Sequence, residues 1–212
     1  MRNFTFEGTP FLSYSWDTIY PVVLELQKQI VSSNYNPDAI VGILRGGAVV
    51  AHMLTDLGLS GQIFSIRIKS YDDIGKQGNM VVCQKFPEQL AECKRLLLVD
   101  DISDHGETFE MACHELERFQ ESHKCKLEVR TAALHIKEHT NFVPNFYVRS
   151  TSSDTWVVHP WESAEVAYKL TPRIVQEHGP QETLKILKEE LLVPGCVAEK
   201  ILSDCLGQKI TI

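Results

Sequence analysis

Apolar residues follow two alternating patterns along most of the chain. Continuous apolar runs at residues 39–44 and 96–99 are bounded by polar or glycine-containing turns, which is typical of strands buried on both faces of a parallel sheet. Between and around these runs, apolar residues recur at helical spacing, at residues 19–30, 49–57 and 109–116. Further segments have the character of strands, at residues 62–69, 127–136, 146–148 and 156–158. This alternation predicts an α/β fold with a central parallel sheet flanked by helices.

The last part of the chain has a different pattern. From Ser163 onward the leucines recur at helical spacing, and Gly-Pro and Pro-Gly pairs at residues 179–180 and 194–195 interrupt the pattern. We therefore expect an α/β core over residues 1–160 and a small helical appendage, or hood, over residues 161–212.

Composition and charge narrow the class of protein. The 212 residues are 43% hydrophobic and 23% charged, close to the average of globular proteins, which excludes global disorder. A formal charge of −7 argues against nucleic acid or an anionic membrane as a partner. No apolar run approaches the ~18 residues of a membrane span, and the first residues lack the pattern of a signal peptide. The six cysteines form no CxxC pair, so we expect reduced thiols and a cytoplasmic protein.

Two of the predicted strands end in unusual loops. Ligands of open parallel sheets bind beyond the carboxyl ends of the strands, so these loops are candidate sites. The first follows the run 39–44, where Gly46 and Gly47 allow a backbone to approach an anion closely and Arg45 supplies positive charge. The loop has neither the GxxxxGK[ST] nor the GxGxxG pattern. An ordinary tight turn from strand to helix is the alternative interpretation.

The second loop follows the run 96–99 and contains several acidic residues. Asp100 and Asp101 lie at the end of a buried strand, where carboxylates need partners or a metal ion. The segment Ser103–Thr108 then opens a helix, whose free N–H groups can bind a phosphate. One segment thus offers carboxylates for sugar hydroxyls or Mg²⁺, followed by a phosphate-binding loop. The alternative is that its aspartates are caps and turn residues, and Asp104 could be such a cap.

Residues 97–108 resemble the signature of the type I phosphoribosyltransferases. The family pattern is an apolar run, two acidic residues, two further residues and Asp-Thr-Gly-x-Thr, and this chain departs from it only by His105 in place of the first Thr. One side-chain hydroxyl is thereby missing, whereas binding of a phosphate by backbone groups is unaffected. Residues 42–47 resemble the pyrophosphate loop of the family, and Ser70-Tyr71 resembles the dipeptide that opens its mobile loop.

The resemblance implies a role for each matching residue. These enzymes use 5-phosphoribosyl 1-pyrophosphate (PRPP) with Mg²⁺ as cofactor. Pyrophosphate would be bound by Arg45, Gly46, Gly47, Ser70 and Tyr71. Asp100 and Asp101 would hold the ribose hydroxyls, directly or through Mg²⁺ and its waters. The 5′-phosphate loop would comprise Ser103, Asp104, His105, Gly106, Glu107 and Thr108, with Asp104 also acting as catalytic base. The polar segment 71–79 is expected to be a loop that acts as a lid.

The remainder of the chain resembles the 6-oxopurine branch of the family. Lys137 occupies the position at which that branch has a lysine that binds the exocyclic 6-oxygen of the base. The segment from Trp156 to Glu162 resembles the Trp-x-x-x-Pro-Trp-acid segment of the xanthine–guanine type, in which Trp156 stacks on the purine and the backbone near Val157 meets its 2-position. Core packing of Trp156 and a solvated surface position of Lys137 are the alternatives.

The resulting expectation is a purine salvage enzyme that transfers the phosphoribosyl group from PRPP to xanthine, guanine or hypoxanthine and releases pyrophosphate. The resemblance also implies a homo-oligomer, either a dimer or a tetramer. Alternatives are a PRPP-sensing regulator on the same fold, although the charge of −7 offers no basic face, and an enzyme for another base. His135 and His139 are spaced i, i+4, but on a strand that runs into a loop, so no zinc site is expected there.

Overall fold

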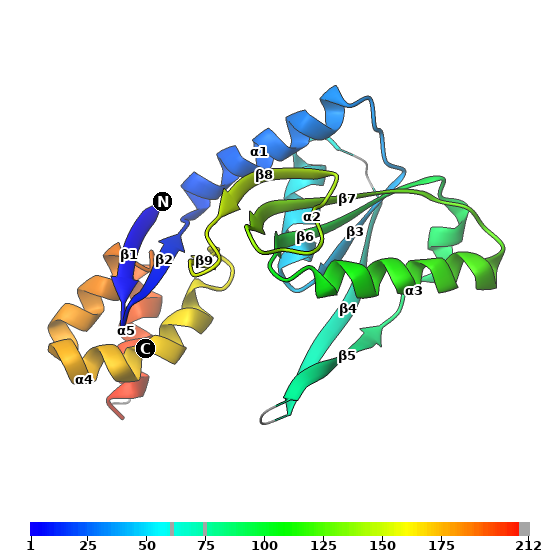
Figure 1. The fold of residues 1–212 in the computed structure, drawn as a ribbon. Coiled ribbons are helices and arrows are strands. Elements are labelled where there is room, and N and C mark those ends of the chain that lie inside the picture. Colours follow the sequence, from blue (N-terminus) through cyan, green and yellow to red (C-terminus); the bar gives the residue numbers. More distant parts are fainter. Residues whose placement is uncertain (60–61, 74–75, 208–212) are drawn as a thin grey trace. The chain divides into compact units, whose positions relative to one another are not determined.

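A six-stranded sheet forms the centre of the larger part of the molecule in the computed structural model (Figure 1). The structure describes residues 1–59, 62–73 and 76–207, with the strands at 70–73 and 76–79 described by their backbone alone. The strand order is β5-β4-β3-β6-β7-β8, and every neighbouring pair is parallel except β4 and β5. The strands are β3 (Ala39–Leu44), β4 (Gln62–Asp73), β5 (Lys76–Gln84), β6 (Arg95–Ser103), β7 (Glu128–Lys137) and β8 (Phe146–Thr151). The predicted α/β class with a central sheet is confirmed.

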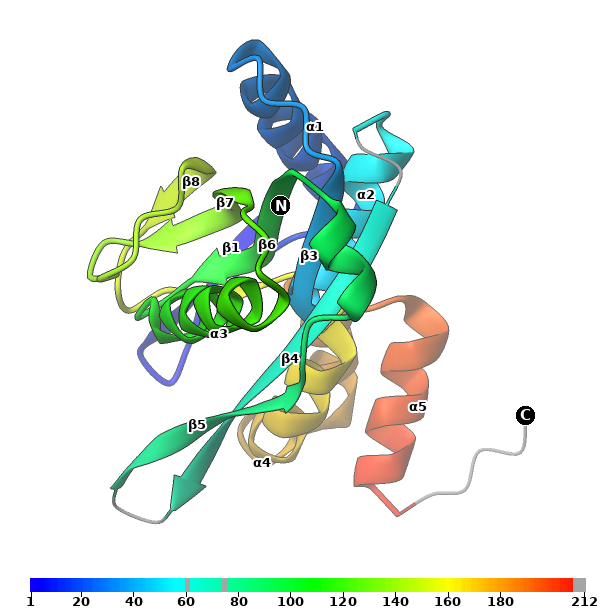
Figure 2. The same ribbon diagram turned by 90° about the vertical axis from the view of Figure 1, so that its right-hand side faces the viewer.

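Helices cover both faces of this sheet (Figure 2). Helix α3 (Glu107–His123) packs on one face with the short 3-10 helix η1 (Glu88–Glu92). Its buried residues Phe109, Ala112 and Leu116 join a core cluster with alternate residues of β3 and β6. Helix α2 (Gly46–Asp56) packs on the other face, and Gln27 of α1 (Trp16–Ser32) donates to the carbonyl oxygen of Leu57 at its end. The apolar runs 39–44 and 96–99 are therefore buried from both sides, as predicted.

The structure has strands where the sequence predicted a loop over residues 71–79. Strand β4 continues to Asp73 and β5 begins at Lys76, and the two pair antiparallel with Tyr71 opposite Asn79. Hydrogen bonds between the backbones build this hairpin, so the polar side chains gave no strand pattern to recognise. The side chains of Ser70 and Tyr71, expected to bind pyrophosphate, lie outside the described residues, as does the centre of the expected lid.

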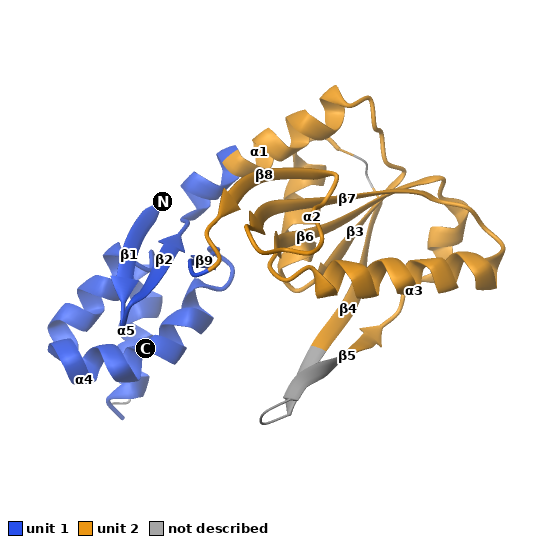
Figure 3. Cartoon of the chain, in the orientation of Figure 1, with its two compact units in different colours: residues 1–21, 154–212 blue, residues 22–153 orange. Residues whose placement is uncertain are grey.

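A second, smaller unit joins the two ends of the chain (Figure 3). Strand β9 (Trp156–Val158) pairs with β2 (Thr9–Ser13), which pairs with β1 (Arg2–Phe6). Phe6, Phe11 and Val158 share a core with α4 (Ser163–Glu189) and α5 (Gly195–Cys205). The expected break at residue 179 is present, because Gly179 has the positive φ of 74° and interrupts the helical backbone of α4. No helix within the described ranges is long and apolar enough to cross a membrane.

The division of the chain differs from the expected boundary after residue 160. One unit comprises residues 22–153, and the other comprises residues 1–21 with 154–212. The reason is the sheet β1-β2-β9, because its strands come from both ends of the chain. The two N-terminal strands have only five residues each, and such short segments gave no strong strand signal in the sequence.

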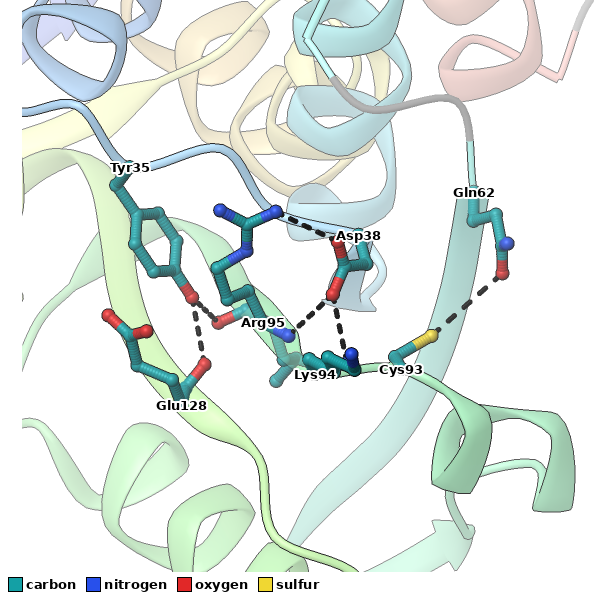
Figure 4. Close-up of polar contacts among 8 residues, drawn as sticks. Tyr35, Asp38, Gln62, Cys93, Lys94, Arg95 and Glu128 are labelled. Carbon is teal, nitrogen blue, oxygen red and sulfur yellow. Dashed lines mark hydrogen bonds and ion pairs between the residues drawn. The ribbon is translucent and has the colours of Figure 1, made fainter.

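Polar contacts hold together the amino ends of β3, β6 and β7 (Figure 4). The hydroxyl of Tyr35 donates to two backbone carbonyls, one of β6 at 2.7 Å and one of β7 at 2.9 Å. Asp38 accepts the backbone N–H groups of Lys94 at 2.9 Å and Arg95 at 2.8 Å, and these bonds lower the pKa of its carboxyl. This cluster lies at the opposite end of the strands from Leu44 and Ser103, so substitutions here change stability without touching the loops considered below.

Tyr35→Phe is expected to lower the free energy of unfolding by about 1 to 2 kcal/mol, because two carbonyls lose their donor. Burial raises the pKa of Tyr35 to about 12, from an ordinary value of 10.0. Since the folded pKa lies above the unfolded one, this contribution is complete below pH 10.0 and is lost as the pH rises towards about 12. Urea unfolding should show a smaller difference in free energy of unfolding between the wild type and Tyr35→Phe near pH 11 than near pH 8. A difference that stays constant contradicts this role of the Tyr35 hydroxyl.

Candidate active site

The turn between β3 and α2 brings backbone groups against the end of β6. A Cβ on Gly42 would lie 2.6 Å from the Cα of Ala48, so the first turn of α2 packs directly on β3. A Cβ on Gly47 would overlap the carbonyl oxygen of Val99, and one on Gly46 would overlap a carboxylate oxygen of Asp101. The peptide bond before the exposed Arg45 is cis. The predicted pyrophosphate loop is thus in contact with the predicted ribose-binding residues.

Asp100 and Asp101 lie within β6, which continues to Ser103 instead of ending at residue 99. The carboxylate of Asp100 accepts the backbone N–H of Asp101 at 2.9 Å and that of Gly47. Burial, followed by the charge of Asp101, raises the pKa of Asp100 well above its ordinary value. Two adjacent, half-buried carboxyl groups form an all-oxygen donor set, and a donor set of this kind suits Mg²⁺. The residues present fit the metal ion that the resemblance implies.

The segment after β6 forms one wall of a pocket. The pocket has a volume of about 270 Å³ and is lined by Met80 and by every residue from Asp100 to Phe109. Gly106 immediately precedes α3 and has a φ of 97°, so its backbone conformation favours glycine. As the N-cap residue, Gly106 has no side chain to accept hydrogen bonds from the first N–H groups of α3, and such groups at a helix start can bind a phosphate. The structure brings Asp100, Asp101 and the predicted 5′-phosphate loop together.

A neighbouring loop after β7 supports this segment. The hydroxyl of Ser103 donates to the carbonyl oxygen of Phe142 at 2.8 Å and lies 3.0 Å from the hydroxyl of Thr140. The ring of Phe142 stacks on that of Phe109 with 5.0 Å between centroids. A Cβ on Gly106 would lie 2.6 Å from the Cβ of Phe142. The hydroxyl of Ser103 therefore holds the loop after β7 against the phosphate loop, so Ser103 acts as a positioning residue.

Asp104 and His105 lie at the exposed end of the pocket. The side chain of Asp104 is 56% exposed, and its Oδ1 lies 3.0 Å from Nε2 of His139. The ring of His105 lies 4.4 Å from that of His139, between centroids. Asp104 is thus accessible to a ligand in the pocket, which a catalytic base requires. Sequence reasoning missed His139, Thr140 and Phe142 as neighbours of the site, because a loop without periodicity gives no signal of what it packs on.

Lys137 is the last residue of β7 and lies at the same edge of the sheet as Ser103. Its side chain is buried, with 4% exposure, so the alternative of a solvated surface lysine is wrong. The Nζ group donates to the carbonyl oxygen of Ser152 at 3.3 Å. A buried ammonium group at the carboxyl edge of a parallel sheet is suited to binding a polar atom of a ligand.

Trp156, Val157 and Glu162 belong to the smaller unit. Trp156 is 50% exposed at the start of β9, so full burial in the core is not its role. Its ring lies 6.5 Å from that of Phe11, while Val157 is buried. Glu162 accepts the backbone N–H of His159 at 3.1 Å and thus holds the corner before α4. An exposed aromatic face next to this corner leaves Trp156 available for stacking.

Comparisons with known proteins agree with this geometry. The family model described as "Phosphoribosyl transferase domain" matches residues 15–171. The chain is 27% identical over 155 residues to a curated relative, the xanthine-guanine phosphoribosyltransferase of Cereibacter sphaeroides (strain ATCC 17025 / ATH 2.4.3), covering 71% of this chain and 86% of the relative.

Solved structures show the same likeness. A purine phosphoribosyltransferase from Pyrococcus horikoshii Ot3 has a TM-score of 0.58 and 27% identity, over 71% of this chain and 93% of that chain. The Helicobacter pylori xanthine-guanine-hypoxanthine phosphoribosyltransferase has a TM-score of 0.60 at 24% identity, over 75% of this chain and 98% of that chain, which shows the shared fold. With the signature at residues 97–108 and a family match over most of its length, the chain belongs to the type I phosphoribosyltransferases.

Proposed function

We propose that this protein transfers the 5-phosphoribosyl group from PRPP to a 6-oxopurine base, with Mg²⁺ as cofactor and release of pyrophosphate. The observation that carries the proposal is that three segments with the required chemistry lie next to one another at the carboxyl ends of β3 and β6. The aspartate pair at the end of β6 and the loop before α3 line the same pocket, and Gly46 and Gly47 contact that pair from the end of β3. Carboxylates for a ribose, a phosphate-binding helix start and a glycine turn with Arg45 are the parts that PRPP needs.

The site stabilises charge that develops as the glycosidic bond breaks. The ribose gains positive charge in an oxocarbenium-like transition state, and negative charge grows on the leaving pyrophosphate. Asp100 and Asp101 hold the ribose hydroxyls beside the developing cation, and Arg45 with the backbone at Gly46 and Gly47 binds the pyrophosphate. Mg²⁺, when bound by the two carboxylates, supplies further positive charge for the leaving group. The N–H groups that follow Gly106 hold the 5′-phosphate and so fix the position of the ribose.

Asp104 removes the proton from the attacking ring nitrogen of the base. It lies in the pocket wall between the ribose carboxylates and the phosphate loop, and it is exposed to an incoming ligand. A positioned general base contributes roughly 10² to 10⁴ to the rate. Glu107 and Thr108, in the first turn of α3, and the backbone of His105 complete the phosphate loop.

The base class rests on two lines of support. The buried ammonium group of Lys137 is a donor suited to the exocyclic 6-oxygen of a purine. Trp156 has the exposed ring that stacking requires, and such stacking is worth about 1 to 3 kcal/mol per base. By resemblance to the xanthine–guanine type, the backbone at Val157, near the corner held by Glu162, would meet the 2-position. The relatives from Cereibacter sphaeroides and Pyrococcus horikoshii are a xanthine-guanine and a purine phosphoribosyltransferase, respectively.

Pyrophosphate release in the presence of single bases tests the proposal. With PRPP and Mg²⁺, we expect release with at least one of xanthine, guanine and hypoxanthine, and at most one hundredth of that rate with adenine, orotate or uracil, because a site built to hydrogen-bond one polar edge discriminates against bases that present another. Chelation of Mg²⁺ with EDTA should abolish release, and added Mg²⁺ should restore it. Release only with orotate or uracil contradicts the base class. Tight PRPP binding without release for any base contradicts the enzyme and favours the regulator.

A further inference from the structure

A cluster of one carboxylate and two imidazoles lies at the exposed end of the phosphate loop. Asp104, His105 and His139 each offer one ligand atom, and these three atoms lie within 4.8 Å of one another. His105 is the residue by which the loop departs from the family signature, and His139 comes from the separate loop after β7. His135, the i, i+4 neighbour of His139, is fully buried in β7 and takes no part.

The contact between Asp104 and His139 has the separation of two ligands of one metal ion. Oδ1 and Nε2 are 3.0 Å apart, and two bonds of about 2.0 to 2.1 Å at a common ion place their ends at a similar separation. Within the described part of the chain, Nε2 meets no acceptor with hydrogen-bond geometry, and Nδ1 of the same ring has no hydrogen-bond partner either. Both nitrogens are nevertheless shielded from solvent. Shielded imidazole nitrogens without hydrogen bonds are costly, and coordination would satisfy one of them.

The donor set selects the class of metal. Two imidazole nitrogens and one carboxylate oxygen suit Zn²⁺ and its first-row neighbours, whereas Mg²⁺ prefers oxygen ligands throughout. The cluster therefore differs in chemistry from the pair Asp100 and Asp101, and the two sites can be occupied by different ions. Three protein ligands also leave one position of a tetrahedral Zn²⁺ ion open to water or to a phosphate oxygen.

We infer that Asp104, His105 and His139 form a binding site for a divalent transition metal, Zn²⁺ being the best match, and that its occupation inhibits the enzyme. Inhibition rests on the proposed function: a carboxylate that coordinates Zn²⁺ cannot accept the proton of the purine, and the ion lies at the mouth of the phosphate loop. Binding of the metal itself does not depend on that function.

Cobalt spectroscopy tests the site directly. Co²⁺ is titrated into the full chain in excess Mg²⁺, and its visible bands report coordination by nitrogen and oxygen. A sulfur-to-cobalt band in the near ultraviolet would reveal binding to the free cysteines instead. Zn²⁺ affinity is then measured by competition with bound Co²⁺. We compare the wild type with His139→Gln, His105→Thr and the control His52→Gln, which removes an exposed histidine of α2.

We expect the affinity for Co²⁺ and Zn²⁺ to fall at least about tenfold in His139→Gln and in His105→Thr, since even outer-shell partners of a metal are worth 10- to 100-fold. His52→Gln should bind as the wild type does. Absence of binding in the wild type, equal binding in all four proteins, or a sulfur band that accounts for all bound cobalt overturns the site.

Inhibition is measured separately, as the Zn²⁺ concentration that halves each protein's own rate of pyrophosphate release in excess Mg²⁺. This concentration should rise at least about tenfold in His139→Gln, in step with the loss of affinity. A wild type that binds Zn²⁺ through these residues but transfers no phosphoribosyl group contradicts the proposed function and leaves the metal site intact. An active enzyme that Zn²⁺ does not inhibit overturns the regulatory inference.

Discussion

Asp104→Asn is expected to lower turnover with the best 6-oxopurine by roughly 10² to 10⁴, the contribution of a positioned general base. Asparagine preserves the size and the polarity of the side chain but cannot accept the proton of the ring nitrogen. PRPP should still bind, because the carboxylates of Asp100 and Asp101 and the backbone N–H groups after Gly106 are unchanged. Turnover is measured by pyrophosphate release, and PRPP affinity is measured by titration calorimetry with Mg²⁺.

The matched control is Glu110→Gln. Glu110 is an exposed acid one turn into α3, and it does not line the pocket, so the control removes one negative charge close by without entering the site. Its turnover should stay within about twofold of the wild type, because exposed charges on a helix are screened. Turnover of Asp104→Asn near the wild-type value would remove Asp104 from the role of base. A parallel loss of PRPP affinity would instead indicate that Asp104 mainly binds substrate.

The strands of the large sheet could be predicted because burial on both faces leaves a continuous apolar run. The runs 39–44 and 96–99 became β3 and the first part of β6, and the segment that follows the second run lines the pocket. The extension of β6 to Ser103 was missed because its last residues are held by pairing with β7 and not by apolar burial. The strands at the N-terminus were missed for a related reason. They are short, and their pairing with β9 and their packing on α4 and α5 involve residues that are distant in sequence.

The site was predictable to the extent that one segment carries it. Asp100 to Thr108 are consecutive, so spacing alone placed carboxylates beside a helix start, and the resemblance supplied the roles. The contribution of the loop after β7 depends on tertiary contacts. Nothing in the sequence indicates that Phe142 packs on Gly106 or that His139 reaches Asp104, because these residues are more than 30 positions apart. The burial of Lys137 likewise follows from its place at the end of β7.

The adjacent glycines of the β3–α2 turn should respond very differently to substitution. For Gly47→Ala, the new methyl group would overlap the carbonyl oxygen of Val99 and lie 2.9 Å from the Cα of Asp100. Both are backbone atoms of β6, which hydrogen-bonds to strands on both sides and cannot move away. We expect a loss of about 3 kcal/mol or more in the free energy of unfolding and a Tm lower by on the order of 10 °C.

For Gly46→Ala, the three atoms nearest to the methyl group all belong to the carboxyl group of Asp101, which can rotate aside. Stability should therefore change by no more than about 1 kcal/mol. The displaced carboxylate no longer lies beside Asp100, so the KM for PRPP should rise roughly 10- to 100-fold, equivalent to losing one hydrogen bond to a charged group. Thermal unfolding and PRPP saturation curves separate these two effects.

Gly195→Ala is the matched control, because Gly195 is the first residue of α5 as Gly46 is of α2. A Cβ there would make an ordinary contact at 3.6 Å with Lys188, so neither Tm nor KM should change appreciably. If Gly46→Ala and Gly47→Ala lost stability equally with the same KM, the close approach of this turn to β6 would serve packing alone. A high KM in a stable Gly46→Ala protein would instead show that PRPP binding depends on the position of the Asp101 carboxylate, because that group is the one displaced.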